Sequence, residues 1–460
     1  MPESPAAAQP PRLNASVAKR RSKLAAVALA GLTTVTGGST LLMGQPASAA
    51  PADAGTPQQI PVSLTGQGVR YEKSSHRAAG HVGSPGRNSG SGSDEDYREE
   101  VPCDPDALIE AVTEANNNGG GKLSLAEKCT YTLPADQGGS GLPQIFQPVI
   151  INGNGATITR AANADEFRIF HVGAGGNLKL RDLTLTRGKV ESGDGGAINV
   201  DPAGRLTTSH VTLTDNIAAN GGAVGNQGIA DLRASDLGKN YAGGGGGAVF
   251  NANGRLTVTA SRLNRNASGS GGGLNSAGGS VTISKSLIEH NTGSNGGGIL
   301  SGSTLLDIDK STIQHNPATG IGGGLAIVNG PAYLWRSSVS ENTANQAGGI
   351  QGQGQLAIAD SRVTGNSANL GGGTVVIVGD MTVRRSQINE NQALTGFGGG
   401  VLNAPGSSLA LTDVEVTRNI ANAPAGGIHS SGTVTTNGRV RITDNAPTNC
   451  APTSVPNCFG

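Results

Sequence analysis

The residues best suited to chemistry form one group in the middle of the chain. Asp307 and Asp309 flank an aliphatic residue, and Lys310 follows them. In a strand, side chains two positions apart leave the same face, so both carboxylates should point outward. Paired carboxylates within about 5–10 Å of each other can cleave a glycosidic bond. The same residues could also bind a ligand without any catalysis.

Aromatic and cationic residues should lie beside these acids, one coil away in the repeat described below. They include the only Trp of the chain. Indole and phenol rings have an apolar face that can stack on a sugar ring. We therefore expect a ligand-binding face for polysaccharide, and we find no active-site motif that would make catalysis the first choice. The candidate binding residues are Asp307, Asp309, Lys310, Tyr333, Trp335 and Arg336.

A second column contains His290, His315 and Glu341, one residue in each of three coils. Such side chains are common metal ligands. A straight row at coil spacing does not converge on one point, however. The sequence therefore predicts no metal site and no cofactor.

Charge patterning gives little support for a nucleic-acid partner. Lys and Arg together number 33 and so do Asp and Glu, so the formal net charge is zero. No basic patch interleaved with aromatic residues is evident. One column of basic residues is interrupted by Asp360, and we interpret it as solvated surface of mixed sign. Its basic members are Lys285, Lys310, Arg336 and Arg385.

The elements that carry these residues follow from a repeated tetrad of three small residues and, in nine of ten copies, an aliphatic one. Copies recur every 24–27 residues, and a fixed period of this size indicates a solenoid. Glycine pairs permit positive φ and close backbone approach at a tight corner. The tetrads begin at Gly195, Gly221, Gly246, Gly271, Gly296, Gly322, Ala347, Gly371, Gly398 and Ala425.

An Asn recurs in phase with the tetrads, three residues after an aliphatic residue. An Asn side chain can bond nearby backbone at a turn, and stacked amides can bond each other as in fibrils. We therefore expect a hydrogen-bonded column. Its members are Asn216, Asn240, Asn266, Asn291, Asn316, Asn342, Asn366, Asn391, Asn419 and Asn445.

Stretches between tetrad and Asn alternate apolar with polar residues, as in Leu256–Thr259, which is typical of strands. The predicted fold is an all-β solenoid, a right-handed parallel β-helix of about ten or more coils at ~4.8 Å per coil. Each coil should contain three short strands. One aliphatic column should face inward: Leu206, Leu232, Val258, Ile283, Ile308, Leu334, Ile358, Val383 and Leu411.

The ends of the rod have their own signals. Residues 107–116 have apolar residues at helical spacing, with Asp104 placed to cap a helix and Pro105 in its first turn. This short helix should cover the first coil. We assign residues 101–190 to an N-terminal cap and first coils, and residues 191–446 to the repeats.

Four cysteines lie outside the repeats, and an even number in an exported chain suggests disulfides. Three pairings are possible, and proximity favours Cys103 with Cys129 and Cys450 with Cys458. Residues 447–460 would then form a C-terminal disulfide cap.

Residues 1–49 resemble an export signal, with a basic start, an apolar Ala- and Leu-rich run and a small-residue cleavage site at Ala47–Ala49. No later segment could span a bilayer. Residues 50–100, rich in Pro, Gly, Ser and Ala, are predicted to be a disordered linker. We expect a secreted or extracellular protein, with association to the cell wall as the alternative to free release.

The tetrad with its following aliphatic-x-x-Asn resembles the polymorphic outer membrane protein repeat, although Leu, Ile or Val replaces the Phe of that signature. Residues 129–133 and 151–158 resemble the opening of pectate-lyase-like β-helix proteins. The first resemblance implies surface adhesion, and the second implies polysaccharide binding or cleavage.

The sequence therefore predicts a secreted or cell-surface β-helix protein that binds polysaccharide or another surface ligand without catalysis. A polysaccharide lyase or glycoside hydrolase of the pectate-lyase-like superfamily is the alternative. A purely structural rod is a third possibility.

Overall fold

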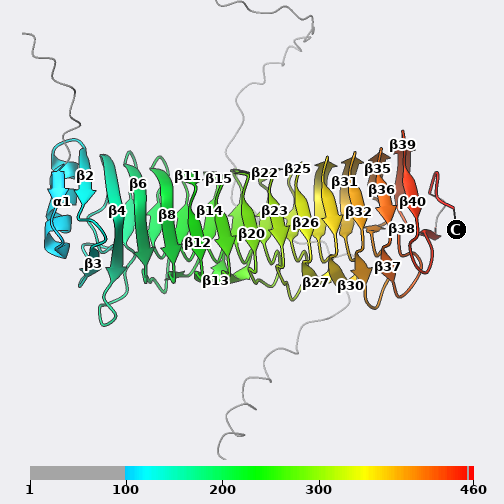
Figure 1. Ribbon diagram of the computed structural model, residues 1–460, viewed down its shortest axis with the longest axis horizontal. Helices are drawn as coiled ribbons and strands as arrows, with labels where there is room; N and C mark the ends of the chain where they lie inside the picture. Colours follow the sequence, from blue (N-terminus) through cyan, green and yellow to red (C-terminus); the bar gives the residue numbers. More distant parts are fainter. Residues whose placement is uncertain (1–98, 453–454, 460) are drawn as a thin grey trace, which may run out of the picture. The chain divides into compact units, whose positions relative to one another are not determined.

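Residues 99–452 and 455–459, which the computed structural model describes, form a parallel β-solenoid of about 14 turns. Successive coils stack side by side along the rod (Figure 1). The predicted parallel β-helix is therefore confirmed. The expected signal peptide and linker lie outside the described residues, apart from positions 99 and 100, which belong to a strand. No helix in the described part is long and apolar enough to cross a membrane.

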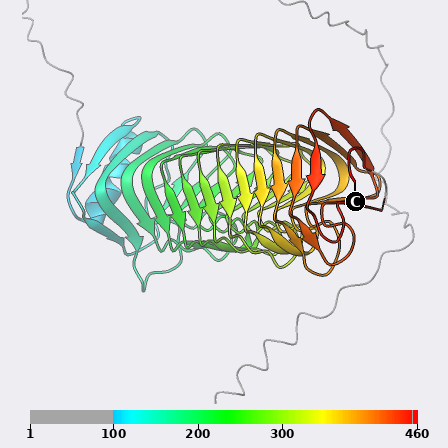
Figure 2. The same ribbon diagram turned by 45° about the vertical axis from the view of Figure 1, so that its right-hand side comes forward.

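Each coil contains three main strands, which form three faces that run the length of the solenoid (Figure 2). Face A follows each tetrad. Its strands are β5 (Phe170–Val172), β7 (Ile198–Val200), β10 (Val224–Asn226), β14 (Val249–Ala252), β18 (Leu274–Ala277), β21 (Ile299–Gly302), β24 (Leu325–Val328), β34 (Val401–Asn403), β38 (Ile428–Ser430) and β41 (Cys450–Pro452).

Face B comes next in each coil and carries the candidate binding residues. Its strands are β1 (Glu99–Val101), β2 (Gly121–Leu125), β11 (Ile229–Arg233), β15 (Arg255–Thr259), β19 (Ser280–Ser284), β22 (Leu305–Asp309), β25 (Ala332–Trp335), β35 (Ser408–Thr412) and β39 (Thr433–Asn437).

Face C closes the coil before the ladder Asn. Its strands are β3 (Thr130–Leu133), β12 (Asp236–Gly238), β16 (Arg262–Asn264), β20 (Leu287–Glu289), β23 (Thr312–Gln314), β26 (Ser338–Ser340), β29 (Arg362–Thr364), β32 (Gln387–Asn389), β36 (Glu415–Thr417) and β40 (Arg441–Thr443).

Some strands cross a corner without a break, and several coils add a short fourth strand that the sequence analysis did not expect. The long strands β4 (Pro148–Arg160), β6 (Asn177–Thr186) and β8 (Arg205–Thr214) span faces B and C, and β28 (Ile350–Ala359) and β31 (Thr374–Arg384) span faces A and B. The fourth strands are β9 (Ile217–Ala218), β13 (Tyr241–Gly245), β17 (Ala267–Ser270), β27 (Thr343–Gln346), β30 (Ser367–Leu370), β33 (Gln392–Ala393) and β37 (Ile420–Ala421).

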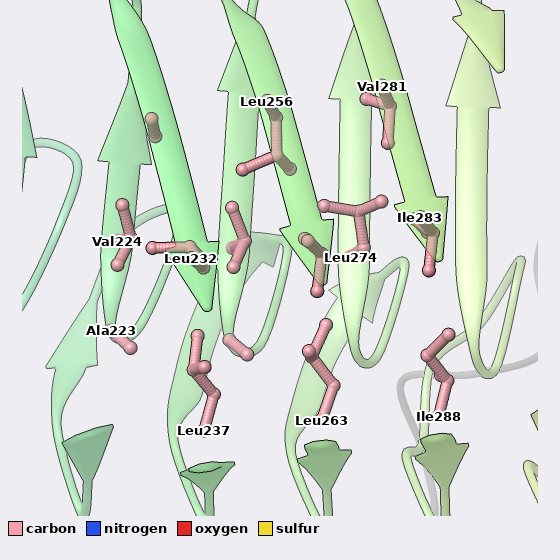
Figure 3. Packing of buried hydrophobic residues seen from close by; sticks show 14 of the residues in the cluster. Ala223, Val224, Leu232, Leu237, Leu256, Leu263, Leu274, Val281, Ile283 and Ile288 are labelled. Atoms are coloured by element: carbon pink, nitrogen blue, oxygen red, sulfur yellow. The ribbon is translucent and has the colours of Figure 1, made fainter. Parts of the chain in front are cut away.

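The core is a thin column of aliphatic side chains stacked coil on coil. Figure 3 shows Leu232, Leu256 and Ile283 pointing inward from successive face B strands. One predicted position is wrong, because Leu206 pairs with Ala230 and stands in the neighbouring inward column. Thr208 occupies the predicted column instead, and its buried hydroxyl bonds the Ser235 hydroxyl at 2.9 Å. The inward column therefore contains one polar residue between Leu180 and Leu232, and its hydroxyl is hydrogen-bonded within the fold.

The predicted Asn column is confirmed as a continuous ladder. From Asn216 to Asn445, each Nδ2 donates to the Oδ1 of the next Asn at 2.9–3.0 Å. Asn445 passes the chain of bonds to Asn449 at 3.0 Å. Because these amides are almost fully buried, each lost bond would leave an unpaired polar group.

A second ladder, of serines, runs along the corner between faces B and C. The backbone N–H of each Ser donates to the hydroxyl of the next at 3.0–3.2 Å. This ladder was missed because Ser is common throughout this chain and the column has no flanking glycine to mark it. Its members are Ser235, Ser261, Ser286, Ser311, Ser337, Ser361 and Ser386.

The tetrad glycines have the two roles expected of them. Gly246 has φ +69°, in the left-handed region that favours glycine. Gly247 lies so close to the next coil that a Cβ there would come within 2.2 Å of the Gly272 carbonyl oxygen. These glycines therefore allow the same tight corner in successive coils to pack directly against one another.

Both ends are closed by their own segments. Asp104 caps helix α1 (Pro105–Asn117), and its side chain accepts from Asp106 N–H at 2.8 Å. The helix buries Leu108 and Val112 against the first coil. The predicted disulfides Cys103–Cys129 and Cys450–Cys458 are both present. At the C-terminal end, β41 covers face A and Cys458 bridges to face C.

Candidate functional site

The predicted binding residues lie together on the outside of face B. Asp307 pairs in register with Tyr333, and Asp309 pairs with Trp335. The intervening Ile308 is buried, so both carboxylates leave the outer face as expected. The structure therefore brings the six predicted residues onto two adjacent coils.

Lys310 and Arg336 lie where face B turns into face C. Both have positive φ, 49° and 46°, and each is followed by a serine of the buried ladder. The left-handed residue projects its long side chain outward while the small serine beside it lies inward. Repetition of this corner in each coil produces a trough parallel to the solenoid axis.

A concave site of about 420 Å³ opens at the predicted acids. It is lined by Asp307, Asp309, Trp335, Arg336 and Asp360. Asp360 was not among the predicted binding residues. Trp335 is 37% exposed, and its ring is nearly parallel to that of Tyr333, with centroids 6.3 Å apart and an interplanar angle of 5°. The site thus combines carboxylates, one guanidinium and an accessible indole.

The two predicted acids have different surroundings. The Arg336 guanidinium donates to Asp309 Oδ1 from Nε at 2.7 Å. Asp307 Oδ1 is buried and has no hydrogen-bond partner among the described residues. Burial, and in addition the nearby Asp309, raise the pKa of Asp307 above its ordinary value. Asp307 therefore holds a proton more readily than an exposed aspartate does.

Asp360, one coil beyond Arg336, is firmly ionised. Arg385 donates to both of its oxygens at 2.8 Å. These hydrogen bonds, chiefly, lower the pKa of Asp360 below its ordinary value. Asp307 and Asp360 therefore line one concave site with opposite tendencies to bind a proton.

We expect Asp307→Asn to raise the melting temperature at pH 7. A folded-state pKa above the unfolded value means that ionising Asp307 destabilises the fold as pH rises through that pKa. Asn removes this cost, so the variant should be more stable by up to about 1 kcal/mol after solvent screening. The difference should shrink as pH falls through the folded-state pKa of Asp307. Thermal unfolding between pH 3 and 8 measures it.

Asp231→Asn is the matched control. Asp231 occupies the same strand position on β11, but its charge is paired with Arg233. Its replacement should not raise the melting temperature. An Asp307→Asn variant with no gain at pH 7, or with a gain independent of pH, would contradict this account of the buried carboxyl.

A longer groove of about 920 Å³ continues from this site along the corner between faces B and C. Its wall shares Arg336 and Asp360 with the smaller site, and ladder serines form its floor. Six cationic residues line it against three carboxylates. The cations are Lys310, Arg336, Arg362, Arg385, Arg439 and Arg441, and the acids are Asp360, Asp413 and Glu415.

Ion pairs neutralise only some of the cations that line this groove. Arg385 pairs with Asp360 at 2.8 Å, and Arg441 pairs with Glu415 at 3.0 Å. Within the described residues, no carboxylate forms an ion pair with Lys310, Arg362 or Arg439. The groove is therefore electropositive, and its cations without an ion-pair partner lie two and three coils apart along the solenoid axis.

The sequence analysis noted the basic column but did not predict the groove. Lys310, Arg336 and Arg385 were assigned to a solvated surface of mixed sign, whereas here they line one concavity together with Arg362 and Arg441. The sequence did contain a signal for the groove, because a basic residue directly followed by Ser recurs at the same place in several repeats.

The second column does not gather ligands around one point. The His290 and His315 rings stack with centroids 5.1 Å apart. His315 Nδ1 lies 3.3 Å from Glu341, whereas His290 Nδ1 lies 3.8 Å from Glu289. Within the described part of the chain, no three His, Cys, Asp or Glu side chains are grouped as a metal site.

Comparison with known proteins finds similarity at the level of structure only. No protein-family model matches the sequence, and no curated protein matches it. Among solved structures, the A-module of mannuronan C-5 epimerase AlgE4 from Azotobacter vinelandii is similar at 12% identity and a TM-score of 0.39, covering 76% of this chain and 96% of that one. The A-module of AlgE6 from the same organism is similar at 15% identity and a TM-score of 0.34, with the same coverage.

Proposed function

We propose that this protein is an extracellular binder of acidic polysaccharide, with the polymer lying in the groove between faces B and C. The observation that carries the proposal is the excess of cations over carboxylates in one concave, axial groove. A linear polyanion presents charges at regular intervals, and a solenoid presents matching cations at multiples of ~4.8 Å. Complementary charge of this kind favours association and specificity.

The aromatic site at one end of the groove supports a sugar ligand. Trp335 offers an apolar ring beside polar groups, and it lies next to Arg336, which lines both cavities. A sugar needs this combination, because its ring has apolar faces and its edges carry hydroxyl groups. Two disulfides are consistent with an oxidising, extracellular location.

Binding without catalysis remains the first proposal, and Asp307 supports one alternative. A half-buried carboxyl with a raised pKa that shares a concave site with the ionised Asp360 resembles the arrangement that glycoside hydrolases use for a general acid. If the site cleaves polysaccharide, Asp307→Asn will abolish turnover while binding persists. If it only binds, wild type will release no reducing or unsaturated sugar ends.

Trp335→Ala should weaken binding of polygalacturonate about tenfold, a loss of roughly 1.4 kcal/mol. The change removes an exposed ring at the mouth of the groove and leaves the buried core unchanged, so the melting temperature should stay the same. Calorimetric titration and thermal unfolding measure the two effects.

The control is Tyr241→Ala, which removes a 51% exposed ring from β13, a fourth strand outside the face B site. Its binding should equal that of wild type. Full binding by Trp335→Ala, or an equal loss in both variants, would remove the aromatic site from the proposal.

A further inference from the structure

A second group of cations lies on face B, nearer the N-terminal end. It lines a cavity of about 220 Å³ that the candidate site does not include. Arg205 and Arg255 occupy the same strand position two coils apart, with Ile229 between them. Lys179 stands beside this column, in register with Thr207.

The charge in this cavity is less neutralised than that in the groove. Its only carboxylate, Asp231, is already bonded to Arg233. Among the described residues, no acid forms an ion pair with Lys179, Arg205 or Arg255. Like charges held together without counter-charges repel one another and favour a bound anion.

Polar groups suited to an oxyanion complete the cavity. The Asn177 amide and the Thr207 and Thr257 hydroxyls line it between the cations. These are the donors that accompany Arg and Lys where proteins hold carboxylate or sulfate groups. The cavity has the size for one charged sugar unit or a smaller substituent.

Both basic regions border face B, because the cavity lies at the start of its strands and the groove lies at the corner where these strands end. Along the solenoid axis, the coil of Arg255 (β15) and the coil of Lys310 (β22) are two coil steps apart, or about 10 Å. Between them, β19 presents only the small residues Ser280, Thr282 and Ser284. From Lys179 to the far end of the groove the distance is ten coil steps, about 50 Å.

We propose that the cavity formed by Lys179, Arg205 and Arg255 is a second anion subsite for the same acidic polysaccharide. This inference rests on the proposed function of the groove. A chain long enough to occupy both regions binds them together, because engagement of the second becomes intramolecular. The protein therefore selects long acidic chains over short ones.

The test is a length series of oligogalacturonates titrated into the whole protein at fixed salt. Wild type should gain at least tenfold in affinity once the oligomer can span both regions. Lys179→Gln with Arg205→Gln should abolish that gain and change the affinity of short oligomers for the groove by less than twofold. Arg205 is exposed and Lys179 is partly exposed, and thermal unfolding of the variant checks that the fold is retained.

The control replaces one Lys and one Arg of equal charge at the turn after face C, outside both basic regions. Lys239→Gln with Arg265→Gln changes two exposed residues at the turn after face C, and the length gain should persist. A gain that survives in the Lys179/Arg205 variant would overturn the second subsite.

A third variant separates this inference from the proposed function. Arg362→Gln with Arg439→Gln, the groove-neutralised protein, leaves four cations against three carboxylates in the groove, so short oligomers should bind this variant chiefly at the N-terminal cavity. If they do, and adding the Lys179/Arg205 changes abolishes that binding, the subsite stands by itself. If short oligomers bind wild type but never the groove-neutralised protein, the groove proposal stands and the second subsite fails. If wild type binds no oligomer of any length, both proposals fail.

Discussion

Asn316→Leu should lower the free energy of unfolding by about 3 kcal/mol or more, the largest effect expected from one substitution in this chain. Asn316 Oδ1 accepts from both the backbone N–H and the Nδ2 of Asn291, and its own Nδ2 donates to Asn342. Leu has a similar volume but no polar atoms. At least two donors of Asn291 would be left buried and unpaired, at about 1–3 kcal/mol each.

The same change at the end of the ladder should cost less. Asn445 is 9% exposed, whereas Asn316 is fully buried, so water can satisfy groups that Asn445→Leu leaves unpaired. A terminal coil also contacts a single neighbouring coil, so its loss can stay local. Denaturant titration should therefore show a clearly smaller shift for Asn445→Leu.

Asn345→Leu is the control, because Asn345 lies in the same coil as Asn342 but is exposed. Its effect should stay within about 0.5 kcal/mol. If Asn316→Leu and Asn345→Leu change the free energy of unfolding by equally small amounts, the buried amide ladder stabilises the fold no more than an exposed Asn does.

Neutralising the groove should have the largest effect on function. Arg362→Gln with Arg439→Gln removes two cations without a described ionic partner, and we expect at least tenfold weaker binding of polygalacturonate at low salt. Each charge close to a bound carboxylate contributes about 1 kcal/mol or more near a protein surface. The dependence of affinity on salt should also become shallower, because fewer screened pairs remain.

Binding is measured by calorimetric titration at several salt concentrations. The control is again Lys239→Gln with Arg265→Gln, which removes the same total charge at the turn after face C, in coils that precede the groove. Equal losses in the two double variants would show that net charge, and not the groove, governs binding.

The fold could be predicted because every coil repeats the same physical requirements. Glycines mark one corner of each coil and Asn marks another. Alternating apolar and polar residues mark the strands between these corners. An error in placing one residue therefore did not affect the other coils. Leu206 was placed one column away because that coil has Thr208 where its neighbours have an aliphatic residue. The end structures were predictable from local signals, such as the Asp104 cap and the proximity of Cys450 to Cys458.

The site was predictable only in part, since a groove is a property of several coils. The spacing of Asp307 and Trp335 placed them side by side, because register follows from the repeat. Sequence spacing could not show that the corner is concave. That shape arises because a basic residue with positive φ is followed by a serine that points inward. Nor could the spacing distinguish the paired Arg385 from Arg362, which has no described ionic partner.

The most direct test of acidic polysaccharide binding compares wild-type affinity for polygalacturonate with that for its fully methyl-esterified form. The two polymers share the same sugar rings and differ in the carboxylate charge. Our account predicts salt-sensitive binding of the acid and at least tenfold weaker binding of the ester, with a double-stranded DNA oligonucleotide unable to displace the acid at equal charge. Equal affinity for acid and ester, or preferential binding of the oligonucleotide, would contradict it.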